Sequence, residues 1–472
     1  MPSHEAGWAH ADGALKAPSW LRQPTDPNAL VRHLWSTTAR KADGVLEVGG
    51  VALPDLVAEH GSPAYVLDEA DFRARARAFR DAFAAYDVFY AGKAFLCTAI
   101  ARWVAEEGLC LDVCSGGELS VAERAGFPME RIGFHGNNKT PAELRRAVEL
   151  GVGRIIVDSF TEIERLAEVV ATSSTDGARR TARVMVRVTA GVEAHTHEYI
   201  ATAHEDQKFG FSITSGDAFE AVRRVEAAPG LELLGLHSHI GSQIFDSSGF
   251  EVAARRVLAL HARISSELGV TMPEMDLGGG FGIAYTTQDD PSDPAQLATE
   301  MTKIVEHECR ALAIPEPRLS IEPGRAIVGP AMCTVYEVGT VKPVALDGGA
   351  SRNYVSVDGG MSDNIRTALY DADYSCTLAS RASEAPPLLT RVVGKHCEAG
   401  DIVVKDEFLP ADVAPGDLLA VPGTGAYCRS MASNYNHALR PPVIAVRDGA
   451  ARVVVRRETE ADLLATDVGD PE

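Results

Sequence analysis

The chain has 472 residues, of which 46% are hydrophobic and 24% charged, so it can form two or three domains with a large buried core. Acidic residues (66) outnumber Lys and Arg (45), which gives a formal net charge of -21 and argues against a nucleic-acid partner. No apolar stretch reaches the roughly 18 residues that a membrane span needs, and the first 45 residues lack the apolar segment of a secretory signal. The eight cysteines form no C-x-x-C pair, so we expect reduced thiols and a cytoplasmic protein.

The N-terminal region divides into two parts. Residues 1–43 are polar and irregular, so we expect an extension, part of it docked on the surface. Residues 44–64 predict a strand near Val45 to Val48, a turn and a helix. We expect this strand to join a β-rich domain that follows later in the chain.

Residues 65–325 alternate between short β-branched runs and Ala/Glu/Arg-rich stretches of helical period. The runs are at 88–91, 111–114, 132–135, 154–158, 183–188, 233–238, 274–278 and 318–322. Strands that alternate with helices predict parallel βα units, and this number of them closes a (β/α)₈ TIM-like barrel. After residue 325 the helical period fades, and residues 326–472 predict a C-terminal β-rich domain, a sandwich or small barrel, with a short polar tail.

Polar residues follow the predicted barrel strands at the point where each strand ends. These residues are Lys93, Asp112, Ser115, His135, Asn137, Asn138, Asp158, Ser159, His237, His239, Ser242, Gly278, Gly279, Gly280, Glu322, Gly324 and Arg325. Because the loops at the carboxyl ends of barrel strands converge on one mouth, we expect an active site there.

Each motif also has a plain structural interpretation. Lys93 in "VFYAGKAFLC" can reach water past an apolar stem, or it can form an imine with a cofactor. The "DLGGGFG" glycines suit a tight turn as well as a phosphate-binding nest. "EPGR" can be a salt-bridged turn. "HSHIGS" looks like a pair of metal ligands, but no third ligand follows at a suitable spacing.

A zinc site is the alternative interpretation of "HTHEYIATAH", which contains His195, His197 and His204. The segment lacks the H-E-x-x-H register and a set of Cys or carboxylate ligands. We therefore expect no metal.

The ordered motifs "YAGKA", "HSHIGSQ", "DLGGGFG", "EPGR", "CEAGD" and "GAY" resemble those of the fold type III, alanine-racemase-like pyridoxal-phosphate decarboxylases. Within them the chain is most similar to the diaminopimelate decarboxylase family, from about residue 45 to 445. The "AHTHEYIATAHEDQKFGFS" segment also resembles this family. The resemblance implies decarboxylation of meso-diaminopimelate to L-lysine and CO₂, the last step of lysine biosynthesis.

The resemblance assigns cofactor roles at the barrel mouth. Lys93 matches the lysine that forms a Schiff base with pyridoxal 5'-phosphate, and His239 matches the imidazole that stacks on the pyridine ring. Glu322 matches the carboxylate at the ring nitrogen, where an opposite charge favours the protonated ring. An alanine racemase has an arginine there, so the glutamate favours a decarboxylase. The remaining cofactor-binding matches are Ser242, Gly279, Gly280, Gly324, Arg325 and Tyr427.

The resemblance also assigns substrate roles in the later half of the chain. Arg325 and Arg366, with Tyr370 and Tyr427 beside them, match binders of the distal carboxylate, for which a guanidinium fork is suited. Glu398 matches the acceptor of the distal ammonium.

Cys397 matches the candidate proton donor, although a lone cysteine would otherwise be read as a small buried hydrophobic residue. In this family the Cys397–Glu398 loop reaches the other subunit, so a homodimer with shared sites is expected. Two positions depart from the family: Ala399 stands where Ser is frequent, and Thr367 where Pro is common.

Two rival functions stay open. One is a related decarboxylase of ornithine or arginine, which would need a distal ammonium binder but no distal arginine. The other is a non-catalytic protein that binds pyridoxal phosphate, which would lack the β-rich domain and the Cys-Glu loop.

Overall fold

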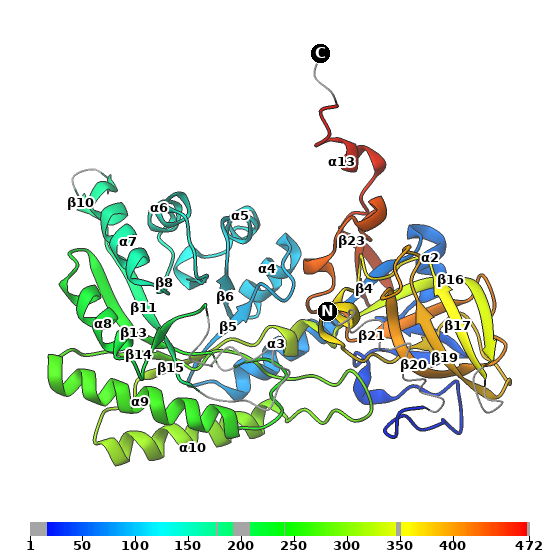
Figure 1. Ribbon diagram of the computed structural model, residues 1–472, viewed down its shortest axis with the longest axis horizontal. Coiled ribbons are helices and arrows are strands. Elements are labelled where there is room, and N and C mark those ends of the chain that lie inside the picture. Colours follow the sequence, from blue (N-terminus) through cyan, green and yellow to red (C-terminus); the bar gives the residue numbers. More distant parts are fainter. Residues whose placement is uncertain (1–16, 176–177, 192–207, 240, 346–350, 470–472) are drawn as a thin grey trace, which may run out of the picture. The chain divides into compact units, whose positions relative to one another are not determined.

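The structure is a computed structural model that describes residues 17–175, 178–191, 208–239, 241–345 and 351–469 (Figure 1). The chain forms two compact units. Unit 1 contains the N-terminal segment up to Phe72, Ile283–Asp290, and the C-terminal part from Val328 onward. Unit 2 contains Arg73–Gly282 and Pro291–Ile327. None of the helices in the described ranges combines the length and the apolarity that a membrane crossing requires.

Unit 2 is a closed barrel of parallel strands, which confirms the predicted (β/α)₈ fold. The ring closes where β15 pairs with β5, with Ser320 opposite Asp87. In ring order the strands are β5 (Asp87–Ala91), β6 (Cys110–Val113), β7 (Ile132–Phe134), β8 (Arg154–Val157), β11 (Ala182–Thr189), β13 (Leu231–His237), β14 (Glu274–Asp276) and β15 (Arg318–Ile321). Each observed strand overlaps one of the predicted runs. A short strand, β12 (Phe211–Ser212), extends the pairing of β11, and β9 (Ser174–Thr175) pairs with β10 (Ala178–Arg179).

Helices alternate with these strands, and local sequence signals fix where several of them begin. Ser115, Thr140 and Ser159 each accept a backbone N–H in the first turn of the following helix, as expected of hydroxyl N-caps. Such caps fix the loops that leave the carboxyl ends of the strands. The helices are α3 (Glu69–Ala82), α4 (Thr98–Glu106), α5 (Gly116–Ala125), η3 (Met129–Arg131), α6 (Pro141–Leu150), α7 (Phe160–Thr172), α8 (Asp217–Ala227), α9 (Ser248–Leu268), α10 (Pro294–Leu312) and α11 (Arg325–Val328).

Unit 1 is rich in strands, as predicted for the C-terminal region. The main path of its large sheet runs β20-β19-β17-β16-β4-β22-β23, and β21 pairs with both β16 and β18. The strands are β4 (Ala64–Asp68), β16 (Met332–Ala345), β17 (Ser351–Val357), β18 (Thr377–Leu378), β19 (Pro387–Val393), β20 (Ile402–Pro410), β21 (Leu418–Pro422), β22 (Val443–Arg447) and β23 (Ala450–Val455). Its short helices are η2 (Arg32–Leu34), α2 (Leu53–His60), α12 (Arg366–Tyr370), η5 (Arg429–Met431), η6 (Tyr435–His437) and α13 (Glu460–Leu464).

Val45–Val48, which was expected to join the β-rich domain, lies in unit 1, but the N-terminal strand that pairs in the large sheet is β4. Val45–Val48 forms β2, which pairs with β1 (Arg40–Ala42) and β3 (Val51–Ala52) in a separate sheet. Its side chains still pack in unit 1, because Leu46 and Val48 belong to the same apolar cluster as Val335. β4 lies inside the range expected for the barrel, but its partners are β16 and β22. All five of its residues are buried, so no alternation indicates which sheet receives them.

Part of the N-terminal extension is docked. Leu34 and Trp35 are 2% and 5% exposed and lie in the apolar cluster of unit 1. Residues 1–16 lie outside the described part of the chain.

Candidate active site

Polar side chains from different barrel strands line one cavity of about 310 Å³ in unit 2. Each follows or ends its strand at the carboxyl edge, where active sites of such barrels form. The predicted strand-end residues Lys93, Asp112, His135, His239 and Glu322 are brought together there. The other lining residues are Ala91, Gly92, Cys114, Gly136, Asn137, Arg187 and Phe209.

Lys93 lies on a turn directly after β5, and this turn packs closely against neighbouring strand ends. Gly92 donates its N–H to Asp112 O at 2.9 Å. A Cβ at Gly324 would lie 2.8 Å from Ala91 O, so glycine at 324 permits the close approach of this loop. Lys93 is exposed and lines the cavity.

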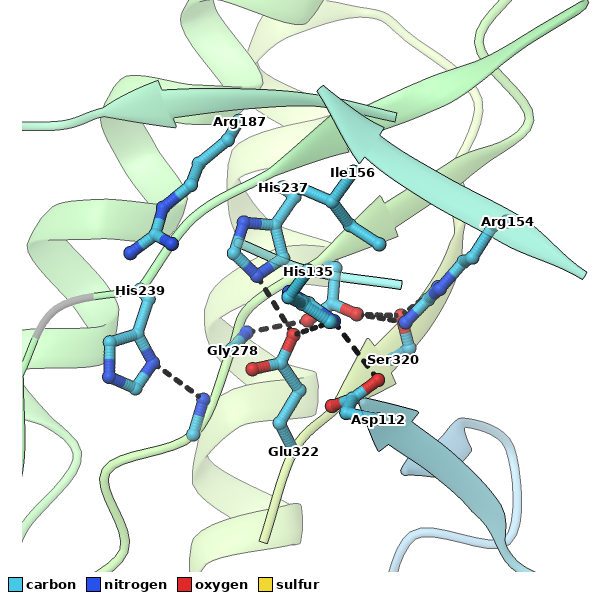
Figure 2. A network of polar contacts seen from close by, with 12 residues as sticks. Asp112, His135, Arg154, Ile156, Arg187, His237, His239, Gly278, Ser320 and Glu322 are labelled. Carbon is cyan, nitrogen blue, oxygen red and sulfur yellow. Dashed lines mark hydrogen bonds and ion pairs between the residues drawn. The ribbon is translucent and has the colours of Figure 1, made fainter. Parts of the chain in front are cut away.

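Two imidazoles contact Glu322, the residue that follows β15 (Figure 2). His237 Nε2 lies 2.8 Å from Glu322 Oε1, and His135 Nε2 lies 3.5 Å from the same oxygen. Burial alone would raise the pKa of Glu322, but His135 and His237 outweigh burial and hold this pKa well below its usual range. Glu322 is therefore an anion at neutral pH.

The pKa of Asp112 is shifted in the opposite direction to that of Glu322. Asp112 is buried, and its Oδ1 lies 3.0 Å from His135 Nε2. Burial and the charge of Glu322 raise the pKa of Asp112 well above its usual range. The pKa values of these neighbouring carboxyl groups are thus pushed apart, so Glu322 gives up its proton more readily than Asp112 does.

A buried arginine ties together the strands that carry the site. Arg154, at the start of β8, donates to Asp276 and to Ser320 Oγ, the latter at 2.9 Å. Its guanidinium carbon also lies 3.7 Å from the centre of the Phe89 ring. These contacts link β8, β14, β15 and β5 inside the barrel, directly before the strand ends that line the cavity.

His239 has a fixed tautomer. Its Nδ1 accepts the N–H of Gly279 at 3.1 Å (Figure 2), so a ring proton can lie only on Nε2. Burial, reinforced by Lys93, holds the pKa of His239 well below its usual value. His239 therefore presents a neutral, oriented ring to the cavity.

The glycine run at 278–280 forms a tight turn. Gly278 and Gly280 have φ values of +73° and +110°, and a Cβ at Gly278 would lie 2.3 Å from Ser238 O. The N–H of Gly278 donates to Asp276 Oδ1 at 2.7 Å, and that of Gly279 donates to His239 as described above. Within the described residues, the Gly280 N–H has no protein acceptor. Of the three amides, that of Gly280 is thus left for an anion.

Two further predicted residues meet in the same unit. Arg325 donates to Ser242 Oγ at 2.7 Å, and Arg325 is 8% exposed. A guanidinium and a hydroxyl held at this distance form a donor pair suited to an anionic group.

His135, His237 and Glu322 have ligand atoms within 4.8 Å of one another, close enough to hold a metal ion. Spacing along the chain had suggested no third ligand for the "HSHIGS" pair, because His135 and Glu322 come from other strands. The contact between His237 and Glu322 has hydrogen-bond geometry, which accounts for their proximity without an ion. His195, His197 and His204, the other candidate ligands, lie outside the described residues.

Arg366 and Tyr370, the predicted substrate-binding residues of unit 1, begin and end the short helix α12. Arg366 is 4% exposed; it donates to Tyr374 Oη at 2.6 Å, and its guanidinium lies 4.5 Å from the centre of the Tyr285 ring. Within the described residues Arg366 has hydroxyl and aromatic neighbours but no carboxylate in ion-pair contact. It is a buried cation without an ionic partner in its own unit.

Cys397 and Glu398 are exposed on a loop. Hydrogen bonds of the preceding residue, His396, hold the backbone of this loop in place. The buried His396 contacts Ser362 Oγ at 2.8 Å, and Asp401 Oδ2 accepts the N–H of His396 at 2.7 Å. The loop therefore has a defined shape, and Cys397 and Glu398 are exposed on it.

Tyr427 follows β21 and has a φ of +63°. Such a conformation in a residue with a large side chain is strained and is often found at functional sites. Tyr427 is half-buried.

Several residues that line the cavity or lie in the polar network beside it had no role predicted from the sequence. His135, His237 and Asp112 were noticed only as strand-end residues, and Arg154 and Arg187 were not singled out. The available signal was an arginine within an otherwise apolar strand, as in "RVMVRV" for Arg187 and "RIIVD" for Arg154. A charge in a buried strand is costly unless it has a partner, so it indicates an internal network.

Comparisons with known proteins agree with this geometry. Residues 69–329 match the family model described as "Pyridoxal-dependent decarboxylase, pyridoxal binding domain". The diaminopimelate decarboxylase of Mycobacterium tuberculosis is 55% identical over 445 residues, which cover 93% of this chain and 98% of that protein. The enzyme of the same name from Mycobacterium leprae is 52% identical over 99% of this chain and 100% of its own length.

A solved structure of diaminopimelate decarboxylase from M. jannaschii, in complex with L-lysine, has a TM-score of 0.84 and 30% identity, covering 92% of this chain and 99% of that one. Three findings lead to one assignment. A family model spans more than half of the chain, relatives align with it over nearly their full length, and a solved structure has a closely similar fold. The chain belongs to the pyridoxal-dependent decarboxylases and, among them, to the diaminopimelate decarboxylase family.

Proposed function

We propose that this protein is a diaminopimelate decarboxylase, which converts meso-diaminopimelate to L-lysine and CO₂ with pyridoxal phosphate as cofactor. The observation that carries the proposal is the cavity of unit 2, where a lysine, a neutral oriented imidazole and an anionic carboxylate meet. The relatives that bear this name are 52–55% identical over nearly the whole chain.

The cavity has the donor set that pyridoxal phosphate requires. Lys93 offers an amine for covalent attachment, and the flat ring of His239 suits stacking on the pyridine. The amide of Gly280, with Ser242 and Arg325, offers donors for the phosphate. When bound, this cofactor supplies an electron sink for the charge that is left at Cα when CO₂ departs.

Glu322 has the task of keeping a proton on the ring nitrogen. A carboxylate that is itself ionised favours a cation at its side, and Glu322 meets this condition because its pKa is held low. The pKa of Asp112 is shifted the other way, upward, so of the two carboxyl groups Glu322 is the one suited to carry the charge.

Substrate selection falls to residues outside the barrel strands. Meso-diaminopimelate carries a second amino-acid group, so its pocket needs a cation for the distal carboxylate and an acceptor for the distal ammonium. Arg366, which has no ionic partner among the described residues, suits the carboxylate, and we assign Arg325, Tyr370 and Tyr427 to substrate binding as well. Glu398 suits the ammonium.

Cys397 and Glu398 support a homodimer with shared sites. Both side chains are exposed in a single subunit, although the proposed roles, Cys397 as proton donor to Cα and Glu398 as ammonium acceptor, need substrate contact. In a homodimer, both side chains can contact substrate that is bound in the active site of the partner subunit. The eight cysteines are free thiols, which supports a reducing compartment, the cytoplasm.

The activity is tested by incubating the purified protein and pyridoxal phosphate with meso-diaminopimelate or with ornithine, and measuring amine product and CO₂. We expect L-lysine from meso-diaminopimelate and far slower turnover of ornithine. Lys93→Ala should lose both the activity and the visible absorbance of the bound cofactor. Faster turnover of ornithine, or a Lys93→Ala protein that stays yellow and active, would refute the proposal.

The shared site is tested by mixing two inactive variants, Lys93→Ala and Glu398→Ala. Heterodimers then contain one site with neither substitution, so up to one working site per heterodimer should return. If subunit exchange is demonstrated by mass spectrometry and no activity returns, the two residues do not come from different subunits.

A further inference from the structure

The contact between His237 and Glu322 bears on how the proposed cofactor site is tuned. His237 ends β13 and Glu322 follows β15, and the two residues are 1% and 6% exposed. Among the described residues, His237 is the one side chain that makes a hydrogen bond to Glu322. The position of this carboxylate therefore depends on His237.

The surroundings of His237 determine which of its nitrogens carries the proton. Its Nδ1 is buried and has no hydrogen-bond partner within the described residues. A proton on Nδ1 would leave a buried donor unsatisfied, whereas a proton on Nε2 is accepted by Glu322 Oε1 at 2.8 Å. His237 therefore donates its Nε2–H to Glu322.

His135 holds the His237 ring in place. The two rings meet edge to face, with centres 5.1 Å apart and an angle of 67° between their planes. His135 also lies 3.0 Å from Asp112 Oδ1. The His237 ring is thus packed against a neighbour that has its own polar partner.

We propose that His237 is a positioning residue for Glu322: its Nε2–H fixes Oε1 and leaves the second carboxylate oxygen directed to the ring nitrogen of the cofactor. This inference rests on the proposed function, because it needs pyridoxal phosphate in the cavity. The charged and titratable groups that surround Glu322 are Lys93, Asp112, His135, Arg154, Arg187, His237, His239 and Asp276.

The experiment uses holoenzyme loaded with pyridoxal phosphate labelled with ¹⁵N at the ring, and reads protonation of that nitrogen from its NMR chemical shift. His237→Phe fills the space but donates no hydrogen bond, and His237→Gln retains an N–H donor. Glu322→Gln marks the shift expected when the charge is lost. His261→Gln is the matched control, because His261 is also buried and makes one hydrogen bond, to Met272 O at 2.9 Å.

We expect the ring nitrogen of His237→Phe to shift toward the value of Glu322→Gln, and kcat to fall by about ten- to a hundredfold, as for loss of a hydrogen bond to a charged group. His237→Gln should restore most of both, and His261→Gln should change neither. A folded, loaded His237→Phe enzyme with the wild-type nitrogen shift would overturn the proposal, as would a His237→Gln enzyme no better than His237→Phe.

If His237→Phe does not fold, the wild-type holoenzyme allows a second test of the proposal. Neutron diffraction should show the His237 proton on Nε2, and a proton on Nδ1 would overturn the proposal. Failure of the proposed function looks different, since the wild-type holoenzyme would then form no L-lysine from meso-diaminopimelate, whatever the shift of its ring nitrogen.

Discussion

A buried site in unit 2 and a buried site in unit 1 hold their charged side chains in different ways. In unit 2, Arg154 contacts Asp276, and Lys139 lies 2.7 Å from Glu162 with both side chains almost fully buried. In unit 1, Arg366 is equally buried but has tyrosines around it rather than a carboxylate. Glu407 of unit 1 is half-buried and has no cationic partner among the described residues; it accepts the backbone N–H groups of Cys376 and Phe408.

Buried charges in ion pairs stabilise the fold, whereas buried charged groups without an ionic partner can bind a ligand or a proton. A buried ion pair is costly to break, because the remaining partner stays buried and uncompensated. A buried cation without a carboxylate has no such dependence within the protein and is available to an anion from outside. We therefore expect substitutions of paired and of unpaired buried charges to affect different observables.

The largest effect is expected at Arg154. Arg154→Met leaves Asp276 buried beside Asp112 without a cation, so the free energy of unfolding should fall by about 3–5 kcal/mol. Arg183→Met is the control, because Arg183 is 46% exposed and pairs with Glu274 at 3.6 Å, for which a loss below about 1 kcal/mol is expected. Chemical denaturation measures both. Equal losses would show that the internal pairing is not what stabilises unit 2.

Glu407 should make the stability of the protein depend on pH. Burial raises the pKa of Glu407 to about 7, above its value in the unfolded chain, so the folded state holds the proton more tightly. Stability is then lost as the pH rises from about 4.5 to about 7, by on the order of 3 kcal/mol.

Glu407→Gln removes this titration. Relative to the wild type, the variant should gain stability between pH 5 and pH 8, as measured by denaturation at both pH values. The exposed Glu460 provides the control: Glu460→Gln should leave the difference between the two pH values unchanged. A Glu407→Gln profile parallel to the wild type would contradict the prediction.

Arg366 should affect the substrate rather than the fold. Arg366→Met removes a charge-assisted hydrogen bond to the distal carboxylate, so kcat/KM for meso-diaminopimelate should fall about ten- to a hundredfold, or roughly 1.5–3 kcal/mol. Arg352→Met is the matched control in the same unit, since Arg352 is 4% exposed but lies 2.6 Å from Asp406. The control should lose stability and keep its KM. The reverse pattern would refute the distinction drawn between paired and unpaired buried charges.

The smallest effect is expected at Tyr374. Tyr374→Phe keeps the ring but removes the hydroxyl that orients Arg366, a change of about 0.5–1.5 kcal/mol. We expect KM for meso-diaminopimelate to rise a few-fold with little change in kcat, in steady-state kinetics. A change in kcat alone would show that Tyr374 does not contribute to substrate binding.

Sequence periodicity was sufficient to predict the barrel and the later strands, because each strand is a local apolar run between helical segments. It could not place β4, since a fully buried strand has no alternation that identifies its sheet. It also could not show that β2 has a small sheet of its own, because pairing partners depend on contacts between distant parts of the chain.

The candidate active site was predictable in part because the local sequence also shows where each strand ends. Spacing identifies a residue at the end of a strand, as for Lys93 and Glu322, and the barrel rule then places both at one mouth. Spacing does not identify which strand ends are neighbours, so the grouping of His135 and His237 around Glu322 was missed. The tyrosine setting of Arg366 was missed because Tyr285 and Tyr374 come from separate segments.

The central claim, that the barrel cavity holds pyridoxal phosphate through Lys93, is tested most directly by borohydride reduction of the holoenzyme followed by peptide mass spectrometry. Reduction makes the link between lysine and cofactor permanent. The account predicts a phosphopyridoxyl group on the peptide that contains Lys93 and on no other lysine. A modified lysine elsewhere, or no modification of a protein that retains activity, would contradict it.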